Sequence, residues 1–300
     1  MINYSKKVVK KMYKSEQFGD LSLHTSLMSK LENLVQIRLV LNPLKDGILS
    51  NKFPEKFREK LIDIAKQYLG KIDENDLKIM SVSFPKKDNK YFFSNELKIY
   101  KSHNYSIEIK FSSSLLNKFF VEHFILQSHD IIVKVEEIEF YIKKIEFSKP
   151  INKIEVFRKI VNNNSKIQIF VNYKTPTISP LIRYGKVFRL IDLLEDPVRL
   201  LSSYLFPEEK EKAYKEIIDL LDTSIIHAIS LNSININGKI GIYGKIIYVT
   251  DSFSELAYLL LLLEYLGYGE ERENGCGVLN IVIRPFVNQS EDLNHIFKDD

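Results

Sequence analysis

The order in which apolar patterns follow one another limits the folds open to this chain more than any other feature of the sequence. In the first half, residues 34–41, 77–84 and 105–111 read as strands, and a further extended run covers residues 131–147. Helical spacing of apolar residues appears after the first of these strands and again before the last. The order is therefore strand, helix, strand, strand, helix, strand, which is the ferredoxin-like arrangement.

The two helices of this half have recognisable ends. The first should begin near Pro54, because proline suits the first turn of a helix, and should close at Gly70. Along it apolar residues recur at helical spacing, namely Phe57, Leu61, Ile64, Ala65 and Tyr68. The second should begin at the serine cap formed by residues 112–114 and continue through Phe124.

The second half repeats the same order without repeating the sequence. A strand is expected at residues 166–173, followed by a helical region over residues 195–221 that breaks near Pro207. The later elements are strands at 225–235 and 239–249, a helix at 255–266 and a strand at 278–283. Asn237-Gly238 is a strong hairpin signal between the two middle strands. The sequence thus predicts an α+β protein with two tandem ferredoxin-like domains.

The expected domains are residues 34–150 and residues 151–287. Residues 1–33 form a basic, helical extension, and residues 288–300 form an acidic tail. A length of 300 residues with 45% hydrophobic side chains is enough for two cores. The net charge of +4 permits a nucleic-acid partner without requiring one.

Composition also bears on the compartment. The single cysteine, Cys276, excludes an internal disulfide and suits a reducing environment. No secretory h-region follows the N-terminus, and the most apolar run, residues 256–266, is interrupted by Glu264 and too short to span a bilayer. We expect a cytoplasmic protein that does not bind membranes.

Residues 267–277 form a loop with two Gly-x-Gly pairs separated by five residues. Helix capping and strand entry account for Gly267 and Gly277, but they leave Gly269 and Gly275 unexplained. Glycine lets another backbone approach closely, so the pattern favours contact with a ligand such as a phosphate backbone. The loop follows a helix and precedes a strand, which is the reverse of the common nucleotide-binding loops. Any bound anion would therefore rely on loop amides and on Arg272.

This combination resembles the repeat-associated mysterious proteins of CRISPR systems. Within that superfamily it is most similar to the endoribonuclease family that cuts CRISPR repeat transcripts, the sixth of the Cas proteins. Weaker supporting stretches are Lys110-Phe111-Ser112-Ser113 and Ile178-Ser179-Pro180-Leu181. The resemblance covers about residues 34–285.

The resemblance implies cleavage within the repeat RNA without a metal or other cofactor. The 2′-hydroxyl of the nucleotide would attack the scissile phosphate and leave a 2′,3′-cyclic phosphate. This chemistry needs a base near the 2′-oxygen and cations near the phosphate. The partners implied are the precursor transcript and other Cas proteins, with the chain a monomer or a homodimer.

The family's usual catalytic histidine is missing from residues 70–78, which follow the first helix. The remaining candidates for catalysis are Lys52, Tyr68 and Lys71, together with His24 if the N-terminal extension folds back over the site. The sequence by itself favours a core position for Tyr68. The six histidines are dispersed, and no two stand at metal-ligand spacing, so no metal site is expected.

Candidate RNA contacts fall into three groups. The first is the glycine loop, with Gly267, Gly269, Arg272, Gly275 and Gly277. The second is one face of the first helix, where Lys56 and Lys60 continue the four-residue spacing of Lys52 and can follow a phosphate chain or simply face solvent. The third comprises Arg183, Lys186 and Arg189, which lie among Tyr184 and Phe188 in a mixture that suits phosphate contacts and base stacking.

Two other functions stay open at this point. The missing histidine favours a non-catalytic RNA-binding subunit of a CRISPR effector complex. A metabolic enzyme on a ferredoxin-like scaffold would need a cluster of acidic, histidine or cysteine residues, which the sequence does not display. The two full domains favour the processing enzyme.

Overall fold

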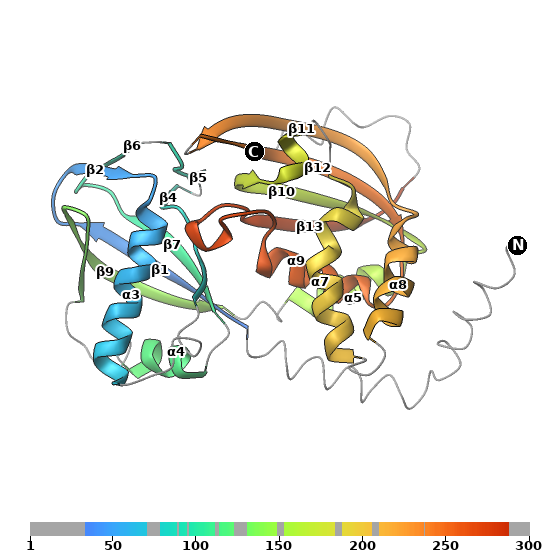
Figure 1. Cartoon of the computed structure of the whole chain (residues 1–300), viewed down its shortest axis with the longest axis horizontal. Helices are drawn as coiled ribbons and strands as arrows, with labels where there is room; N and C mark the ends of the chain where they lie inside the picture. Colours follow the sequence, from blue (N-terminus) through green and yellow to red (C-terminus); the bar gives the residue numbers. More distant parts are fainter. Residues whose placement is uncertain are drawn as a thin grey trace, which may run out of the picture.

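The computed structural model describes residues 34–70, 79–88, 90–94, 96–111, 114–122, 131–148, 153–183, 188–205, 210–236 and 238–287. Within them, two main antiparallel sheets lie side by side, each with helices packed against it (Figure 1). We call the part from β1 to β9 the first domain and the part from α5 to β13 the second domain. The predicted extension at 1–33, the boundary at 150 and the tail at 288–300 lie outside the described residues.

The first domain is built on four central strands in the order β9-β1-β7-β3, which is the ferredoxin-like order. They are β1 (Val35–Pro43), β3 (Ile79–Val82), β7 (Tyr105–Phe111) and β9 (Ile138–Ser148). The other strands are β2 (Gly47–Ser50), β4 (Lys86–Lys87), β5 (Lys90–Tyr91), β6 (Glu96–Ile99) and β8 (Ile132–Val135). Of these, β2 and β6 form a separate two-stranded sheet.

Two helices pack against this sheet, α3 (Phe53–Leu69) and α4 (Ser114–Phe119). The predicted helix start at Pro54 is confirmed, and Gly70 follows the last helical residue with a φ of 81°. Alternate residues of β1 are buried, and they share one core with Phe57 and Leu61 of α3. The predicted continuation of the second helix to Phe124 lies partly outside the described residues.

The second domain has the order β11-β12-β10-β13, again ferredoxin-like. Its strands are β10 (Lys166–Ile178), β11 (Ile225–Ile236), β12 (Lys239–Asp251) and β13 (Leu279–Pro285). Its helices are α5 (Ile154–Asn162), α6 (Pro180–Arg183), α7 (Leu190–Leu205), α8 (Lys210–Leu221), α9 (Leu256–Leu266) and the short 3-10 helix η4 (Arg272–Asn274). The prediction of two ferredoxin-like domains is confirmed.

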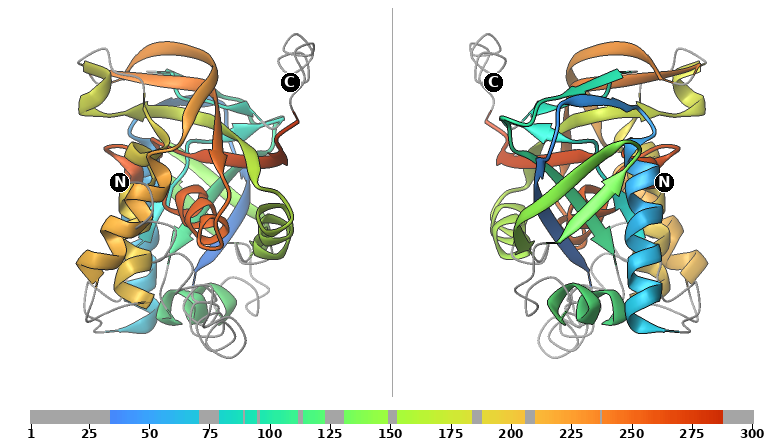
Figure 2. Two further views of the ribbon diagram at one scale, coloured as in Figure 1. Left: turned by 90° about the vertical axis from the view of Figure 1, so that its right-hand side faces the viewer. Right: turned by 90° about the vertical axis from the view of Figure 1, so that its left-hand side faces the viewer.

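The core of the second domain surrounds α9, in which nine of eleven residues are buried. Figure 2 shows α5 and α9 below the strands of this sheet, and α7 also packs on α9. Two details differ from prediction. Helix α7 begins at Leu190 and carries Pro197 inside it. Helix α5 was not predicted, although Ile154, Phe157 and Val161 form a buried stripe along it. None of the described helices is long and apolar enough to cross a membrane.

Candidate nucleic-acid interface

The glycine loop, residues 267–277, runs from α9 to β13 along the end of β10. Glu270 N donates to Ile178 O at 2.7 Å, and Gly277 N donates to Pro176 O at 2.9 Å. Seven loop amides donate to main-chain carbonyl oxygens of the protein, those of Gly267, Tyr268, Glu270, Asn274, Gly275, Cys276 and Gly277. A phosphate would have to displace a carbonyl oxygen to reach any of these seven amides.

All four glycines of the loop have positive φ, between 70° and 99°. A Cβ on Gly269 would overlap the carbonyl oxygen of Ile178. A Cβ on Gly275 would lie 2.9 Å from Phe84 Cδ2 and 3.0 Å from Pro54 Cγ. Gly269 and Gly275 therefore have a structural reason to be glycine, because the protein's own main chain and side chains lie too close for a Cβ; their contact with a ligand stays a prediction.

The loop also joins the two domains. Cys276 is buried with Ile178 of the second domain and Phe84 of the first. At the end of α9, Tyr265 Oη lies 2.7 Å from Phe111 O and 3.0 Å from Val35 O, both in the first domain. These contacts hold the end of α9 and the glycine loop against the sheet of the first domain.

A buried lysine also contributes to this joint between the two domains. Lys110 of β7 donates from Nζ to the main-chain oxygen of Glu264 at 2.9 Å, and its Nζ lies 5.7 Å from the centre of the Tyr265 ring. Burial lowers the pKa of Lys110, and the carboxylates of Glu108 and Glu264 oppose this shift. Lys153 forms an ion pair with the Glu264 carboxylate.

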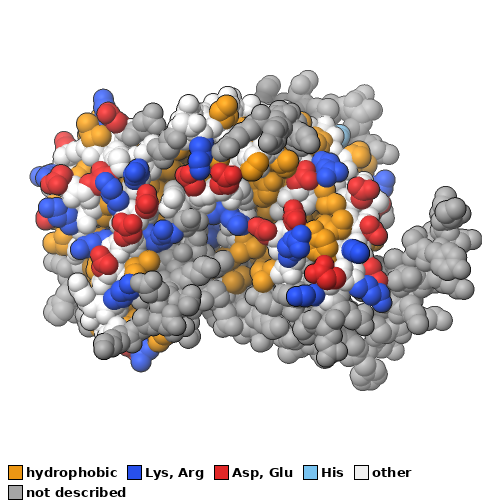
Figure 3. Space-filling view, viewed as in Figure 1, with side chains coloured by type: hydrophobic (Ala, Val, Ile, Leu, Met, Phe, Trp, Pro, Cys, Tyr) orange, Lys and Arg blue, Asp and Glu red, His pale blue; other side chains and the backbone are white. Residues whose placement is uncertain are grey.

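Charged side chains around the glycine loop are paired with one another. Lys239, at the start of β12, lies 2.6 Å from a carboxylate oxygen of Glu271 and 3.4 Å from one of Glu270. Arg272 pairs with Asp196 of α7 at 3.2 Å. Figure 3 shows basic and acidic side chains interspersed over this face. The loop's arginine is thus held by a residue of α7, a partner that the sequence did not suggest.

The N-terminal end of α3 lies beside the loop, because Pro54 is one of the side chains that Gly275 approaches. Lys52 stands just before the helix and is exposed. Lys56 pairs with Glu136 at 3.0 Å, and Ser50 donates to the same carboxylate through both N and Oγ. Burial would raise the pKa of Glu136, but the hydrogen bonds from Ser50 and the ammonium of Lys56 outweigh it and hold this pKa below its usual range.

The two catalytic candidates that the structure describes do not come together in one place. Lys52 and Tyr68 stand at opposite ends of α3, about 24 Å apart along the helix axis at 1.5 Å per residue. They cannot act on the same phosphate. The preference for a core position at Tyr68 is also wrong, since its side chain is 37% exposed and its ring leans on Phe119 at 5.8 Å. Lys71 and His24 lie outside the described residues.

The basic face of α3 is mixed. Lys60 is exposed, as predicted for a residue that could meet a phosphate chain. Glu59 and Asp63 are exposed on the same helix and reduce its positive charge. Lys56 is neutralised by Glu136.

In the third group of candidates the structure describes Phe188 and Arg189, and both have partners within the fold. Phe188 is 1% exposed and packs against Tyr268 at 4.9 Å, so it cannot stack on a base. Arg189 is exposed and pairs with Asp192 at 3.1 Å, at the start of α7. Arg183 belongs to α6, but its side chain, like Tyr184 and Lys186, lies outside what the structure describes.

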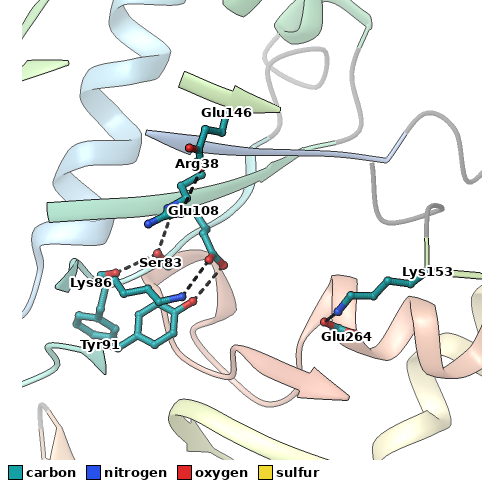
Figure 4. Close-up of polar contacts among 9 residues, drawn as sticks. Arg38, Ser83, Lys86, Tyr91, Glu108, Glu146, Lys153 and Glu264 are labelled. Carbon is teal, nitrogen blue, oxygen red and sulfur yellow. Dashed lines mark hydrogen bonds and ion pairs between the residues drawn. The ribbon is translucent and has the colours of Figure 1, made fainter. Parts of the chain in front are cut away.

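A polar network on the sheet of the first domain was not predicted (Figure 4). Tyr91 donates to Glu108 at 3.0 Å, and Lys86 Nζ lies 3.7 Å from the same carboxylate. Burial, together with the negative charge of Glu108, raises the pKa of Tyr91. Ser83, next to Phe84 in the chain, accepts a hydrogen bond from Glu108 N at 2.9 Å. The network therefore supports the residue on which the glycine loop packs.

Arg38 lies beside this network on β1. It is the cross-strand neighbour of Glu108, but its guanidinium bonds to Glu146 of β9 at 3.2 Å. In the alternating burial pattern of β1, Arg38 is at a partly buried position between the buried Ile37 and Leu39. The sequence held no sign of which strands would lie on either side of it.

Metal-ligating residues do not gather in the described part of the chain, where no group of three or more histidine, cysteine or acidic side chains could hold an ion. His103 lies between the rings of Tyr100 and Tyr105, and His227 packs against Phe286. None of these ring contacts involves a residue of the glycine loop.

Similarity to known proteins is found at the level of structure. No model of a protein family matches the sequence, and no curated protein matches it significantly. A Cas6-related protein of Pyrococcus furiosus superposes with a TM-score of 0.51 and 15% identity, covering 83% of this chain and 98% of that protein.

Two further structures extend this comparison. A Cas6 product complex has a TM-score of 0.53 and 14% identity, covering 83% of this chain and 99% of that chain. A partial complex of Cas6-RT-Cas1 with Cas2 has a TM-score of 0.51 and 11% identity, covering 84% of this chain and 46% of that chain. The chain therefore has the fold of Cas6 proteins, with two tandem ferredoxin-like domains.

Proposed function

We propose that this protein binds CRISPR repeat RNA and cleaves it within the repeat. The observation that carries the proposal is the superposition on nearly the whole length of Cas6 structures, one of them a product complex. The joint between the domains supports it, because the glycine loop lies beside Pro54, two residues after the exposed Lys52. An RNA strand crossing this joint would meet residues of both domains.

The proposed reaction is an attack by the ribose 2′-hydroxyl on the adjacent phosphorus. The bond to the 5′-oxygen of the next nucleotide breaks, giving a 2′,3′-cyclic phosphate and a 5′-hydroxyl. Lys52 is our candidate for stabilising charge on the phosphate, since it is exposed and stands at the positive end of a helix dipole. His24 is the candidate base if the N-terminal extension folds back over this region, as the sequence analysis proposed.

A cleavage assay tests the reaction. The substrate is the repeat RNA of a CRISPR array adjacent to the coding region, incubated with the full chain in EDTA. We expect full cleavage in the chelator, a cyclic phosphate on the product, and no cleavage of RNA with a 2′-deoxy group at the cut site. Loss of activity in EDTA that Mg²⁺ or Mn²⁺ restores would refute the metal-independent mechanism.

Single substitutions test where the reaction occurs. Lys52→Ala should lower the single-turnover rate by about 100-fold or more, the scale of one positioned transition-state contact. Tyr68→Phe should change the rate by less than about threefold, because Tyr68 lies at the far end of α3. The reverse result would place the scissile phosphate at the C-terminal end of the helix.

A non-catalytic RNA-binding subunit is the second candidate. It is favoured by the ion pairs that occupy Lys56, Lys239 and Arg272, which leave few basic groups for chemistry around the loop. In that case the chain would bind repeat RNA without cutting it and would co-purify with other Cas proteins.

A further inference from the structure

The arginine of the glycine loop is held at the surface by a residue outside the loop. Arg272 Nη1 lies 3.2 Å from Oδ2 of Asp196 on α7, with 33% of the arginine side chain and 59% of the aspartate side chain exposed. A phosphate presents its oxygens to a guanidinium in the same way as a carboxylate does. Asp196 therefore occupies a position at which an RNA phosphate could bind Arg272.

This ion pair is not needed to hold α7 in place. Four apolar residues bury one side of the helix in the core of the second domain, namely Leu193, Leu194, Val198 and Leu201. An exposed ion pair contributes only about 0–1 kcal/mol to stability, because water and salt screen both charges. Asp196 can therefore release Arg272 without loosening the helix.

The main chain at the arginine does not depend on the aspartate either. Asn274 N and Cys276 N both donate to Glu271 O, at 2.9 and 3.3 Å. Gly275 N donates to Arg272 O at 3.2 Å. All three bonds are made within the loop. The arginine side chain can therefore exchange one oxygen partner for another while its backbone stays in place, which keeps the entropic cost of the exchange small.

The other two acidic residues of α7 have partners on or next to their own helix. Asp192 pairs with Arg189, three residues before it. Glu195 pairs with Arg199, one turn after it. Neighbours at this spacing pair without help from tertiary structure. Among the ion pairs described for α7, that of Asp196 is the one that reaches the glycine loop.

We propose that Asp196 competes with RNA for Arg272. In the free protein the carboxylate holds the guanidinium. In the complex a backbone phosphate of the repeat RNA takes its place, and the aspartate turns to solvent. This inference rests on the proposed binding of repeat RNA and identifies a contact of the loop that changes when RNA binds.

The competition makes binding selective. Because the aspartate is tethered beside the arginine, its effective concentration is high, and a single weakly held phosphate does not displace it. RNA that contacts both domains at once brings its phosphate to the arginine at a comparable effective concentration. The ion pair therefore favours the repeat RNA over short or loosely bound RNA.

Equilibrium filter binding of the full chain at several salt concentrations tests the proposal. The ligand is repeat RNA with a 2′-deoxy group at the cut site, so that it stays intact. Asp196→Asn should bind this RNA about two- to fivefold more tightly than the wild type does, the scale of a surface ion pair that RNA no longer has to break. The slope of log K against log salt concentration should be steeper by up to about 0.7, because binding no longer frees a carboxylate that takes up a cation.

Two controls separate direct competition from a general effect of charge. Glu195→Gln removes one negative charge from the adjacent residue of the same helix, whose partner is Arg199. Its affinity should stay within about 1.5-fold of the wild type, because salt screens charges that do not touch the RNA contact. In an Arg272→Ala background, Asp196→Asn should no longer change the affinity, as a double-mutant cycle requires.

Three outcomes would overturn the inference. They are equal affinity and slope for wild type and Asp196→Asn, an equal gain in Glu195→Gln, and a gain that persists in the Arg272→Ala background. Each of these leaves the proposed RNA binding standing, because the wild-type affinity measures it in the same assay. A wild-type chain that does not bind the repeat RNA would instead overturn the proposed function together with this inference.

Discussion

Replacing Gly269 with alanine should destabilise the protein well beyond the ordinary cost of a side chain at positive φ. The matched control is Gly238→Ala. Gly238 lies in the same domain at a φ of +76°, and a Cβ there would meet nothing within 4 Å. Both variants place an L residue in a left-handed backbone conformation, which costs about 1–2 kcal/mol. Only Gly269, at a φ of +99°, also faces the carbonyl oxygen of Ile178.

The additional cost at Gly269 follows from the hydrogen bond beside it. Moving Ile178 O away from the new Cβ strains or breaks the 2.7 Å bond from Glu270 N, and leaving a buried pair unsatisfied costs about 1–3 kcal/mol. The expected difference between the variants is therefore about 2 kcal/mol, or roughly 4–8 °C in melting temperature for a domain of this size.

Differential scanning calorimetry of both variants measures this difference directly. Equal losses of melting temperature in Gly269→Ala and Gly238→Ala would refute the packing of the glycine loop against β10. Repeat-RNA affinity, measured below the melting temperature, tests the other possibility, which is that the glycine loop contacts RNA directly. A loss of at least about tenfold in Gly269→Ala with no excess loss of stability would support direct contact between the loop and RNA.

Three other outcomes follow from the described contacts. Tyr265→Phe removes the hydroxyl that donates to Val35 O and Phe111 O, so it should lower the stability of the contact between the domains by about 1–2 kcal/mol. Denaturant titration measures this loss, and limited proteolysis between the domains should become faster. The pKa of Glu136 in the folded protein lies below its usual value, so the stabilisation from this carboxylate is present above roughly pH 4.3 and is lost as the pH falls through the folded pKa. The wild type should therefore melt at a higher temperature than Glu136→Gln near neutral pH, and this difference should shrink in acid. A constant difference in melting temperature down to pH 3 would contradict this. Repeat RNA should bind more tightly than DNA of the same sequence, and its binding should weaken as the salt concentration rises. If Lys60 contacts one phosphate, Lys60→Ala should make the slope of log K against log salt concentration shallower by about 0.7. Filter binding at several salt concentrations measures both effects.

Local patterns predicted most of the elements. Asn237-Gly238 sits between β11 and β12, and the residues around Pro54 and Gly70 mark the ends of α3. These signals depend on neighbours in the chain. Helix α5 escaped prediction because it lies directly after the expected domain boundary at residue 150, although Ile154 and Phe157 begin a helical stripe.

The site was harder to predict than the fold. The glycine pattern was visible in the sequence, but what Gly269 and Gly275 pack against lies about 90 to 220 residues away, at Ile178, Phe84 and Pro54. The same holds for Arg272, whose partner Asp196 belongs to a helix that precedes it by 76 residues. Contacts at such separations depend on how distant elements pack within the second domain and, for Phe84 and Pro54, on how the two domains are placed, which periodicity and capping signals do not encode.

The joint between the domains also sets the order in which the protein can reach its final shape. Tyr265 bonds to a residue 230 positions earlier, and Cys276 packs with Phe84. During synthesis the first domain leaves the ribosome long before these residues exist, and domains generally fold as they emerge. The first domain must therefore wait, with Val35 O and Phe84 uncovered, until the last tenth or so of the chain is made. Nascent chains that stop before α9 should expose this surface to chaperones and proteases.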